Sequence, residues 1–217
     1  MIRSRHVNYA LRALQAACIG LALSVPFVAH AQSCFNTLVT PSTPSADFTV
    51  NSDGTAIHIP TGLQWMRCSL GQSSTVGSCI GPASSQPIWA DALLLVEAIN
   101  QGTSDLDGDG MPGFAGYTDW RLPNIKELSS LNEACRRQPA VNDQVFPNAP
   151  ATGVHWSSTT PHMQPSVVWY FDFGMGVVSF TGKSDILPRF IKLVRAGDAA
   201  GDYQAGQYRV FADGFEF

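Results

Sequence analysis

The stretch that decides the fold is residues 117–131, YTDWRLPNIKELSSL. Pro123 restricts the residue before it to an extended backbone, so the chain turns sharply after Arg121. Asn124 can accept a hydrogen bond from a backbone N–H at a helix N-terminus, and Glu127 can reach back to the backbone of Asn124. This reciprocal cap predicts a helix start. Structural rather than catalytic roles are expected for Trp120, Arg121, Pro123, Asn124 and Glu127.

Two helices are predicted from apolar spacing on either side of this corner. The capped helix is expected to place its apolar residues and one cysteine on an inward face, namely Ile125, Leu128, Leu131 and Cys135. A longer amphipathic helix is predicted over residues 88–100, IWADALLLVEAIN. The side expected to be half buried holds Trp89, Leu93, Val96 and Asn100, with Ala92 and Ile99 beside them.

The flanking segments alternate in the manner of β-strands. Residues 48–67 alternate apolar and polar side chains around an Asp-Gly pair typical of hairpin turns, and they predict two strands. Residues 69–87 are rich in Gly, Ser and Pro and predict a loop. Residues 155–197 predict a hairpin and one closing strand, RFIKLVRAG. The face that carries Trp169, Phe171 and Phe173 is expected to pack in the core.

The N-terminal segment has the pattern of an export signal. Three arginines precede an apolar run that ends in Ala29-His30-Ala31, so residues 1–31 are predicted to be a signal peptide. The run is shorter than the ~20 residues that a membrane span needs, so no transmembrane segment is expected after cleavage. The mature protein is therefore expected to be exported, to the periplasm, the cell surface or the medium.

Charge excludes one class of partner. Cleavage leaves 10 basic and 17 acidic residues, a net charge of −7 (10 − 17). Such a chain offers no basic field for nucleic acid. Residues 32–47 are predicted to be a Ser/Thr/Pro-rich leader held mainly through Cys34, and residues 48–197 one domain. Residues 198–217 read as a linker and a tail, which either pairs with the body or serves as a sorting or assembly segment.

Four cysteines remain after cleavage, an even number in an oxidising compartment, and they indicate two disulfides. Four cysteines allow three connectivities. We favour Cys68 with Cys79, because the segment between them is a polar, Gly-rich loop that could close on itself, and Cys34 with Cys135. A zinc site of four thiolates is disfavoured because the sequence has neither a C-x2-C nor a C-x4-C pair.

One motif carries cofactor chemistry of its own. In SDLDGDGMPGFAG, residues 104–116, alternating aspartates precede a glycine at the sharp-turn position, as in the first half of an EF-hand calcium loop. The twelfth position is Gly116 instead of a bidentate glutamate, and Asp119 lies three residues later. Two interpretations stay open: a solvated acidic turn, or a Ca²⁺ site whose ligands are Asp105, Asp107, Asp109 and Asp119.

No catalytic residue is predicted. The sequence has no H-E-x-x-H pair and no serine in a G-x-S-x-G turn, so no nucleophile is placed beside a base. We therefore expect a protein that is not an enzyme.

The order of motifs resembles a known family. TGLQWMRC, WADALLLVEAIN, GYTDWRLPNIKELSSL, HWSSTT, WYFDFGMGVVSF and IKLVRAG, between Gly54 and Gly197, resemble the C-terminal domain family of the Legionella collagen-like adhesin, long a domain of unknown function. The DWRLP corner also resembles C-type-lectin-like domains and sulfatase modifiers. The resemblance implies an α+β fold, C-type-lectin-like or related, with two helices packed on antiparallel strands and stapled by disulfides.

The resemblance also implies a secreted or surface-displayed domain used in adhesion and in binding polysaccharides such as sulfated glycans. This chain departs from the founding adhesin, because it has no Gly-X-Y repeats and no basic surface visible in the sequence. The leading hypothesis is a non-catalytic binding domain for an extracellular glycan or another surface polymer. Its ligand-binding residues are expected on loops of the C-terminal half, at Trp156, His162, Lys183 and Arg189.

Two other classes of function remain as alternatives. The chain could be a structural component of a surface appendage or envelope assembly, docked through its tail. It could also be an enzyme related to sulfatase modifiers, which would need a free thiol in the mature protein.

Overall fold

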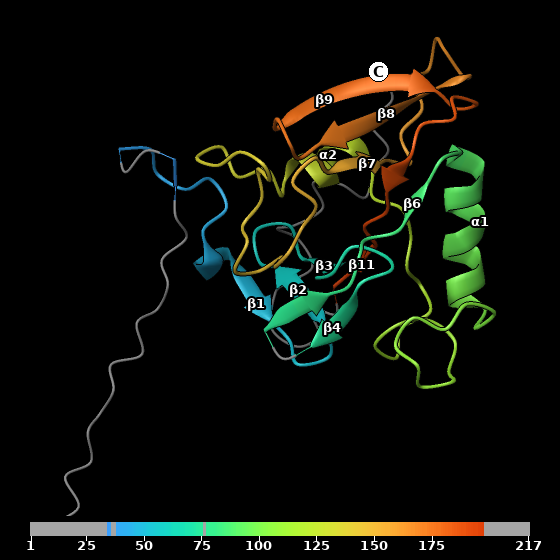
Figure 1. The fold of residues 1–217 in the computed structure, drawn as a ribbon, viewed down its shortest axis with the longest axis horizontal. Coiled ribbons are helices and arrows are strands. Elements are labelled where there is room, and N and C mark those ends of the chain that lie inside the picture. Colours follow the sequence, from blue (N-terminus) through green and yellow to red (C-terminus); the bar gives the residue numbers. More distant parts are fainter. Residues whose placement is uncertain (1–33, 36–37, 76, 198–217) are drawn as a thin grey trace, which may run out of the picture. The chain divides into compact units, whose positions relative to one another are not determined.

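The computed structural model describes residues 34–35, 38–75 and 77–197, and this part of the chain is α+β, as predicted (Figure 1). Its helical elements are η1 (Ser45–Asp47), α1 (Trp89–Asn100) and α2 (Ile125–Ser129). Its strands are β1 (Phe48–Val50), β2 (Thr55–His58), β3 (Leu63–Met66), β4 (Ser73–Thr75), β5 (Ser78–Ile80), β6 (Ser85–Gln86), β7 (Val154–Trp156), β8 (Val167–Asp172), β9 (Val177–Gly182), β10 (Arg189–Phe190) and β11 (Val194–Ala196). No helix of the described residues is long and apolar enough to cross a membrane.

The strands form three sheets. The first is antiparallel with the order β1-β2-β3-β11, the second has the order β6-β10-β7-β8-β9, and β4 pairs with β5 alone. Within the second sheet β10 runs parallel to β7, and the other pairs are antiparallel. The second sheet is therefore mixed, where the sequence suggested antiparallel strands only.

The first sheet is built from a tight hairpin. The Asp53-Gly54 pair makes the turn between β1 and β2, and Gly54 has a φ of +87°, a left-handed conformation that glycine adopts without strain. Residues 48–67 contain three strands instead of the predicted two, because the chain turns again after His58. All four residues of β3 are buried, and Trp65 is fully enclosed in the core.

The predicted closing strand is in fact two strands in two sheets. Arg189–Phe190 forms β10 in the second sheet, and Val194–Ala196 forms β11 in the first. The three residues between them, 191–193, are buried and cross from one sheet to the other. Ile191 and Leu193 pack in one of the two buried apolar clusters, and Val194 packs in the other. A single continuous strand could pair with only one sheet, so the other sheet would lose its partner strand.

The proline corner forms as expected and joins distant elements. Asn124 Oδ1 accepts from the backbone N–H of Glu127 at 2.9 Å, and Glu127 Oε2 accepts from the backbone N–H of Asn124 at 2.7 Å. The carboxylate of Glu127 also accepts a hydrogen bond from each of the two terminal nitrogens of Arg121, both at 2.7 Å. The backbone of Arg121 in turn pairs with Val194 of β11. The corner therefore ties α2 to the first sheet.

Trp120 is buried at this corner, where its indole N–H donates to the backbone oxygen of Phe114 at 3.0 Å. The side-chain amide of Asn100, the last residue of α1, donates to the backbone oxygen of Trp120 and accepts from its N–H. Pro123 is buried too, and its carbonyl accepts from Ser158 beyond β7. These contacts hold α1, the corner and the second sheet together.

Both helices differ in detail from their predicted form. The capped helix ends at Ser129, so Leu131 and Cys135 are buried outside it and not on its face. The hydroxyls of Ser129 and Ser130 donate to backbone carbonyls one turn earlier, which competes with continuation of the helix. In α1 the buried residues are Ala92, Val96 and Ile99, whereas Leu93 is exposed.

Two disulfides link Cys34 with Cys135 and Cys68 with Cys79, the pairing that the sequence favoured. The leader is held by more than Cys34. The backbone N–H groups of Ser42 and Thr43 donate to the buried carboxylate of Glu133, at 2.9 and 3.0 Å. The predicted signal peptide, residues 1–31, and the tail, residues 198–217, lie outside the described residues.

The aromatic stripe of β8 is only partly in the core. Phe171 and Phe173 are buried, whereas Trp169 is half-buried and packs edge-on against Phe180 of β9, which is exposed. Among the described strands β9 pairs only with β8, so it forms an edge of the second sheet (Figure 1). The stripe therefore passes from core to surface along one strand.

Candidate functional site

A pocket of about 360 Å³ opens between three segments that are far apart in sequence. These segments are the β1–β2 turn, the hairpin of β4 and β5, and the acidic loop, defined as residues 102–116. The floor consists of the buried side chains of Met66, Gln72 and Phe114. The rim consists of Ser52, Asp53, Ser73, Ser74, Thr75, Leu106 and Asp107.

Gly54 lets the β1–β2 turn come close to the other two segments. A Cβ atom at this position would lie 2.9 Å from the Ser74 hydroxyl oxygen and 3.1 Å from the Phe114 ring. Real Cβ atoms essentially never show the first of these contacts and seldom the second, and the left-handed φ of Gly54 adds strain for any other residue, so the position favours glycine. The Asp-Gly pair therefore makes the hairpin and also allows it to approach Ser74 and Phe114, two residues of the pocket lining.

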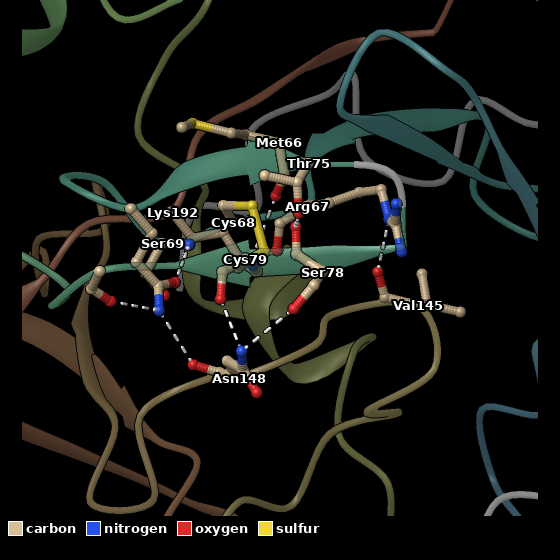
Figure 2. The surroundings of a disulfide bond; sticks show 12 residues. Met66, Arg67, Cys68, Ser69, Thr75, Ser78, Cys79, Val145, Asn148 and Lys192 are labelled. Atoms are coloured by element: carbon tan, nitrogen blue, oxygen red, sulfur yellow. Dashed lines mark hydrogen bonds between the residues drawn. A yellow bond between two sulfur atoms is a disulfide. The ribbon is translucent and has the colours of Figure 1, made fainter.

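One wall of the pocket is the β4–β5 hairpin, which is stapled at its base by Cys68–Cys79 (Figure 2). The amide of Asn148 donates to the backbone oxygen of Cys79 at 2.5 Å and to the Ser78 hydroxyl at 3.3 Å. Gln72 bridges the hairpin internally, since its Oε1 accepts from the backbone N–H of Ser69 and its Nε2 donates to the carbonyls of Gly81 and Asn148. The residues that the sequence assigned to a loop thus form a braced hairpin.

Two buried cations fix the strand that leads into this wall (Figure 2). The Lys192 ammonium donates to the backbone oxygens of Met66 and Arg67, at 3.2 and 3.0 Å, and lies 4.5 Å from the centre of the Phe146 ring. Arg67 donates to the backbone oxygens of Val145 and Gln144. Burial, assisted by the nearby charge of Arg67, lowers the pKa of Lys192 to about 7.

The other wall is the acidic loop, which is held by its own carboxylates. Asp105 accepts from the N–H groups of Gly108 and Gly110, at 2.7 and 3.0 Å, and these bonds lower the pKa of its carboxyl group, with Gly108 as the main cause. Asp107 Oδ2 accepts from the N–H of Ala115 at 2.8 Å, and Asp109 Oδ1 from that of Met111 at 2.7 Å. No covalent link crosses this loop in the described residues.

Three of the four residues predicted to bind calcium lie together. One carboxylate oxygen from each of Asp105, Asp107 and Asp109 lies within 4.8 Å of the others, and all three residues are exposed. Asp119 is not part of this group, because its Oδ1 accepts from Arg195 at 2.6 Å in a salt bridge. The group would supply three hard oxygen ligands, whereas Ca²⁺ takes six to eight.

The predicted ligand set is divided between the interior and the surface. Trp156 is fully buried, and its indole N–H donates to the backbone oxygen of Gln86. Arg189 is also buried, with its guanidinium 4.5 Å from the Trp156 ring centre and 4.6 Å from that of Tyr170. The geometry makes Trp156 and Arg189 part of the packing of β7 against β10, which removes both from contact with a large ligand.

The other two residues of that set lie outside the core. Lys183 is half-buried, with its ammonium 4.3 Å from the centre of the Trp89 ring. His162 is exposed in the β7–β8 connection. Neither residue lines the pocket between the β1–β2 turn, the β4–β5 hairpin and the acidic loop. His155 of β7 is buried between Phe173 and Phe190, and burial lowers its pKa to about 3.

Sequence reasoning missed the pocket, although it singled out parts of it. The sequence does single out the Asp53-Gly54 turn, as a hairpin signal, and Asp107, as a metal ligand. The serines of β4 gave no signal, because they stand in a Ser-rich stretch that resembles any polar loop. The signal that could have pointed to the site is the disulfide closure of that stretch, because binding residues are found disproportionately on loops that a rigid scaffold positions.

Comparison with known proteins identifies one family. The model of the Lcl C-terminal domain matches residues 54–195. That span contains every residue of the pocket except Ser52 and Asp53. A search of curated proteins found no match. Because the matched span covers more than half of the chain and carries the motifs of the corner and the strands, this chain belongs to the Lcl C-terminal domain family.

Proposed function

We propose that this chain is an exported, non-catalytic binding domain of C-type-lectin-like or related architecture, which holds a hydroxyl-rich surface polymer such as a glycan in the pocket described above. Membership of a family founded on a surface adhesin supports a surface role. The two disulfides are compatible with export to an oxidising compartment.

The observation that carries the proposal is the chemistry of the pocket lining. Hydroxyls of Ser52, Ser73 and Ser74 stand on the rim with no hydrogen bond to the described chain. The floor beneath them offers the apolar surfaces of Met66 and Phe114. A sugar ring has the matching character, with hydroxyls at its edge and C–H groups on its faces, and a few convergent polar groups over an apolar floor are typical of ligand sites.

The size of the pocket agrees with this class of ligand. A volume of about 360 Å³ lies near the lower end of the range of roughly 300 to 1,000 Å³ that is typical of small-molecule sites. It accommodates one or two sugar residues and leaves a longer polymer to run over the rim. We therefore expect recognition of a short unit within a chain or of a chain end.

A glycan array with the mature protein tests the proposal. Ser73→Trp fills the pocket from an exposed position of β4 and should abolish binding. Ser184→Trp places the same ring on the exposed β9–β10 connection and serves as the matched control. Loss of binding in both variants, or in neither, would contradict the assignment of the site.

Calcium is a separate proposal at the edge of the same pocket. When bound, the ion would be held by Asp105, Asp107 and Asp109, with water completing a shell to which Asp119 does not contribute. Calorimetric titration with Ca²⁺, with Mg²⁺ as the control ion, tests it. Heat of binding that survives replacement of all three aspartates by asparagine would contradict this assignment.

A structural role in an assembly is the second candidate, and the edge strand β9 favours it. Val177, Val178 and Phe180 are exposed on this strand, and an open edge with apolar side chains is a site where another strand can add. For the form of this candidate in which the tail is the docking strand, deletion of residues 208–217 separates the two candidates. A glycan-binding domain stays folded and keeps its ligand, whereas an assembly component loses its location.

The sulfatase-modifier alternative has less support. The four cysteines of the described residues form two disulfides, which leaves no thiol there for such chemistry. Titration of thiols in the denatured mature protein tests this point, and about one free thiol per chain would restore the enzymatic hypothesis.

A further inference from the structure

The charge of the pocket lining is one-sided. Among the described residues that line it, Asp53 and Asp107 are acidic and none is Lys, Arg or His. Asp105 and Asp109 stand beside Asp107 in the same loop and add to the negative potential. A concave site lined by one sign of charge concentrates ligands of the opposite sign.

Each of the two lining carboxylates is held by one oxygen and has the other free. Asp53 Oδ1 accepts from the N–H and the hydroxyl of Thr55, at 2.9 and 2.7 Å, and no described group donates to its Oδ2. Asp107 Oδ2 accepts from Ala115, and no described group donates to its Oδ1. The carboxylates are therefore oriented by the protein while each keeps one acceptor for a ligand.

Two cations that lie beside the floor residue Met66 direct their donors away from the pocket carboxylates. Arg67 and Lys192 lie next to Met66, but their donors are directed at the backbone oxygens of residues 66, 67, 144 and 145. Arg195, farther along, is paired with Asp119 and with the side-chain oxygen of Gln64. Among the described residues that line the pocket none brings a positive charge to the two carboxylates, which leaves this role to a ligand or an ion.

We propose that the pocket selects a cationic, hydroxylated ligand, an amino sugar with a free ammonium group, over neutral and anionic sugars. The ammonium group would lie between Asp53 and Asp107, and the ring hydroxyls would meet the serines of the rim. This proposal rests on the proposed glycan-binding function and narrows its substrate class. It also separates this chain from the sulfated-glycan binding that its resemblance implied.

Competing sugars fit less well for physical reasons. A sulfated sugar or a uronic acid brings negative charge against two fixed carboxylates, which is repulsive. A neutral sugar satisfies the hydroxyls but draws the two carboxylates out of water without an opposite charge, and that desolvation opposes binding. An ammonium group adds an ion pair with each of the two exposed carboxylates, and because one such pair improves affinity by up to about fivefold, the two together should improve it about tenfold.

Binding of three probes in the presence of a chelator tests the proposal. They are a glucosamine oligosaccharide, the N-acetylglucosamine oligosaccharide of the same length, and a heparin oligosaccharide. The chelator removes metal ions that could bridge a neutral sugar to the carboxylates. At mildly acidic pH, where the amine carries its proton, the glucosamine probe should bind about tenfold more tightly than its acetylated counterpart, and heparin should not bind.

Two neutral variants locate the preference. Asp53→Asn and Asp107→Asn keep the oxygen that accepts from the chain but remove the charge, so each should reduce the preference for glucosamine several-fold. Asp91→Asn, an exposed residue of α1 outside the pocket, is the matched control and should change nothing. Urea unfolding of each variant confirms that the fold is intact.

The possible outcomes separate this proposal from the one on which it rests. Equal affinity for the two glucosamine-based probes, lost in Ser73→Trp, overturns the charge selection and leaves glycan binding in the pocket intact. Preference for heparin, or a preference for glucosamine that survives in both Asp variants, also overturns it. Failure of all three probes overturns the amino-sugar proposal, and a blank result on the full glycan array removes the glycan-binding function as well.

Discussion

The two walls of the pocket line the same cavity, but different kinds of interaction hold them in place. The β4–β5 hairpin is closed by a disulfide and braced by the buried amide of Gln72 and by Asn148. The acidic loop, by contrast, is held by exposed carboxylates that accept from its own backbone. The conformation of the hairpin therefore depends on a covalent bond and buried amides. The conformation of the acidic loop depends on carboxylates that must be ionised.

The largest expected effect follows removal of the covalent staple. In the chain-entropy model a disulfide that closes a loop of this length contributes about 3 kcal/mol, so Cys68→Ser with Cys79→Ser should lower the free energy of unfolding by about that amount. Urea unfolding measures the change. Ile80→Ala, an exposed position of the same hairpin, is the control and should shift stability by less than about 0.5 kcal/mol. A double variant as stable as the parent would show that the hydrogen bonds alone hold this wall.

The next effect is the pH dependence of stability that arises from Lys192, which holds the backbone leading into the hairpin. The folded-state pKa of Lys192, about 7, lies below its unfolded value, so the unfolded state binds more protons between these values and stability rises with pH in that window. The rise should reach about 2 kcal/mol between pH 7 and roughly pH 9. Lys192→Met removes the proton and should flatten this part of the profile. Parallel profiles for the two proteins would contradict a buried lysine with a lowered pKa.

A smaller effect is expected from the amide that braces the same wall. Gln72→Ala leaves the buried N–H of Ser69 without a partner and removes two donors from carbonyls, which should cost about 1 to 2 kcal/mol in unfolding free energy. Gln164→Ala, an exposed glutamine in the β7–β8 connection, should change nothing. Urea unfolding compares them, and equal midpoints would mean that water replaces the bonds of Gln72.

The smallest effect is local and belongs to the acidic loop. The lowered pKa of Asp105 means that its bonds to Gly108 and Gly110 are intact above the unfolded pKa of an aspartate and are lost as pH falls through the folded value. Asp105→Asn should speed hydrogen exchange at these two amides without moving the urea midpoint. Asp109→Asn keeps both bonds and is the control. A global loss of stability in Asp105→Asn would show that the two walls are coupled.

Short-range signals in the sequence predicted the parts of the fold that depend on neighbouring residues. The Asn124 and Glu127 cap, the Asp53-Gly54 turn and the Cys68–Cys79 staple each involve groups close in sequence, and each forms. The same local logic overestimated α2, because Ser129 and Ser130 offer the backbone other hydrogen bonds. Local patterns therefore predict where elements start better than where they end.

Long-range contacts account for what the sequence could not predict. Residues 189–197 read as one strand, and only the presence of two separate sheets explains why the chain divides into β10 and β11. Trp156 and Arg189 resembled loop residues, yet both are buried, and the Arg189 guanidinium lies 4.5 Å from the centre of the Trp156 ring. The pocket combines residues from 52 to 114 that approach only in the folded chain. Its assembly is a property of the tertiary structure.

The bond between Cys34 and Cys135 has a mechanical consequence. Every pocket residue, from Ser52 to Phe114, lies inside the covalent ring that this bond closes. Tension applied along the chain from one side of the domain to the other is transmitted through the sulfur atoms and bypasses that ring. As long as the cystine is intact, pulling can straighten only the residues outside the ring, and the segment that carries the pocket cannot be drawn out into a line.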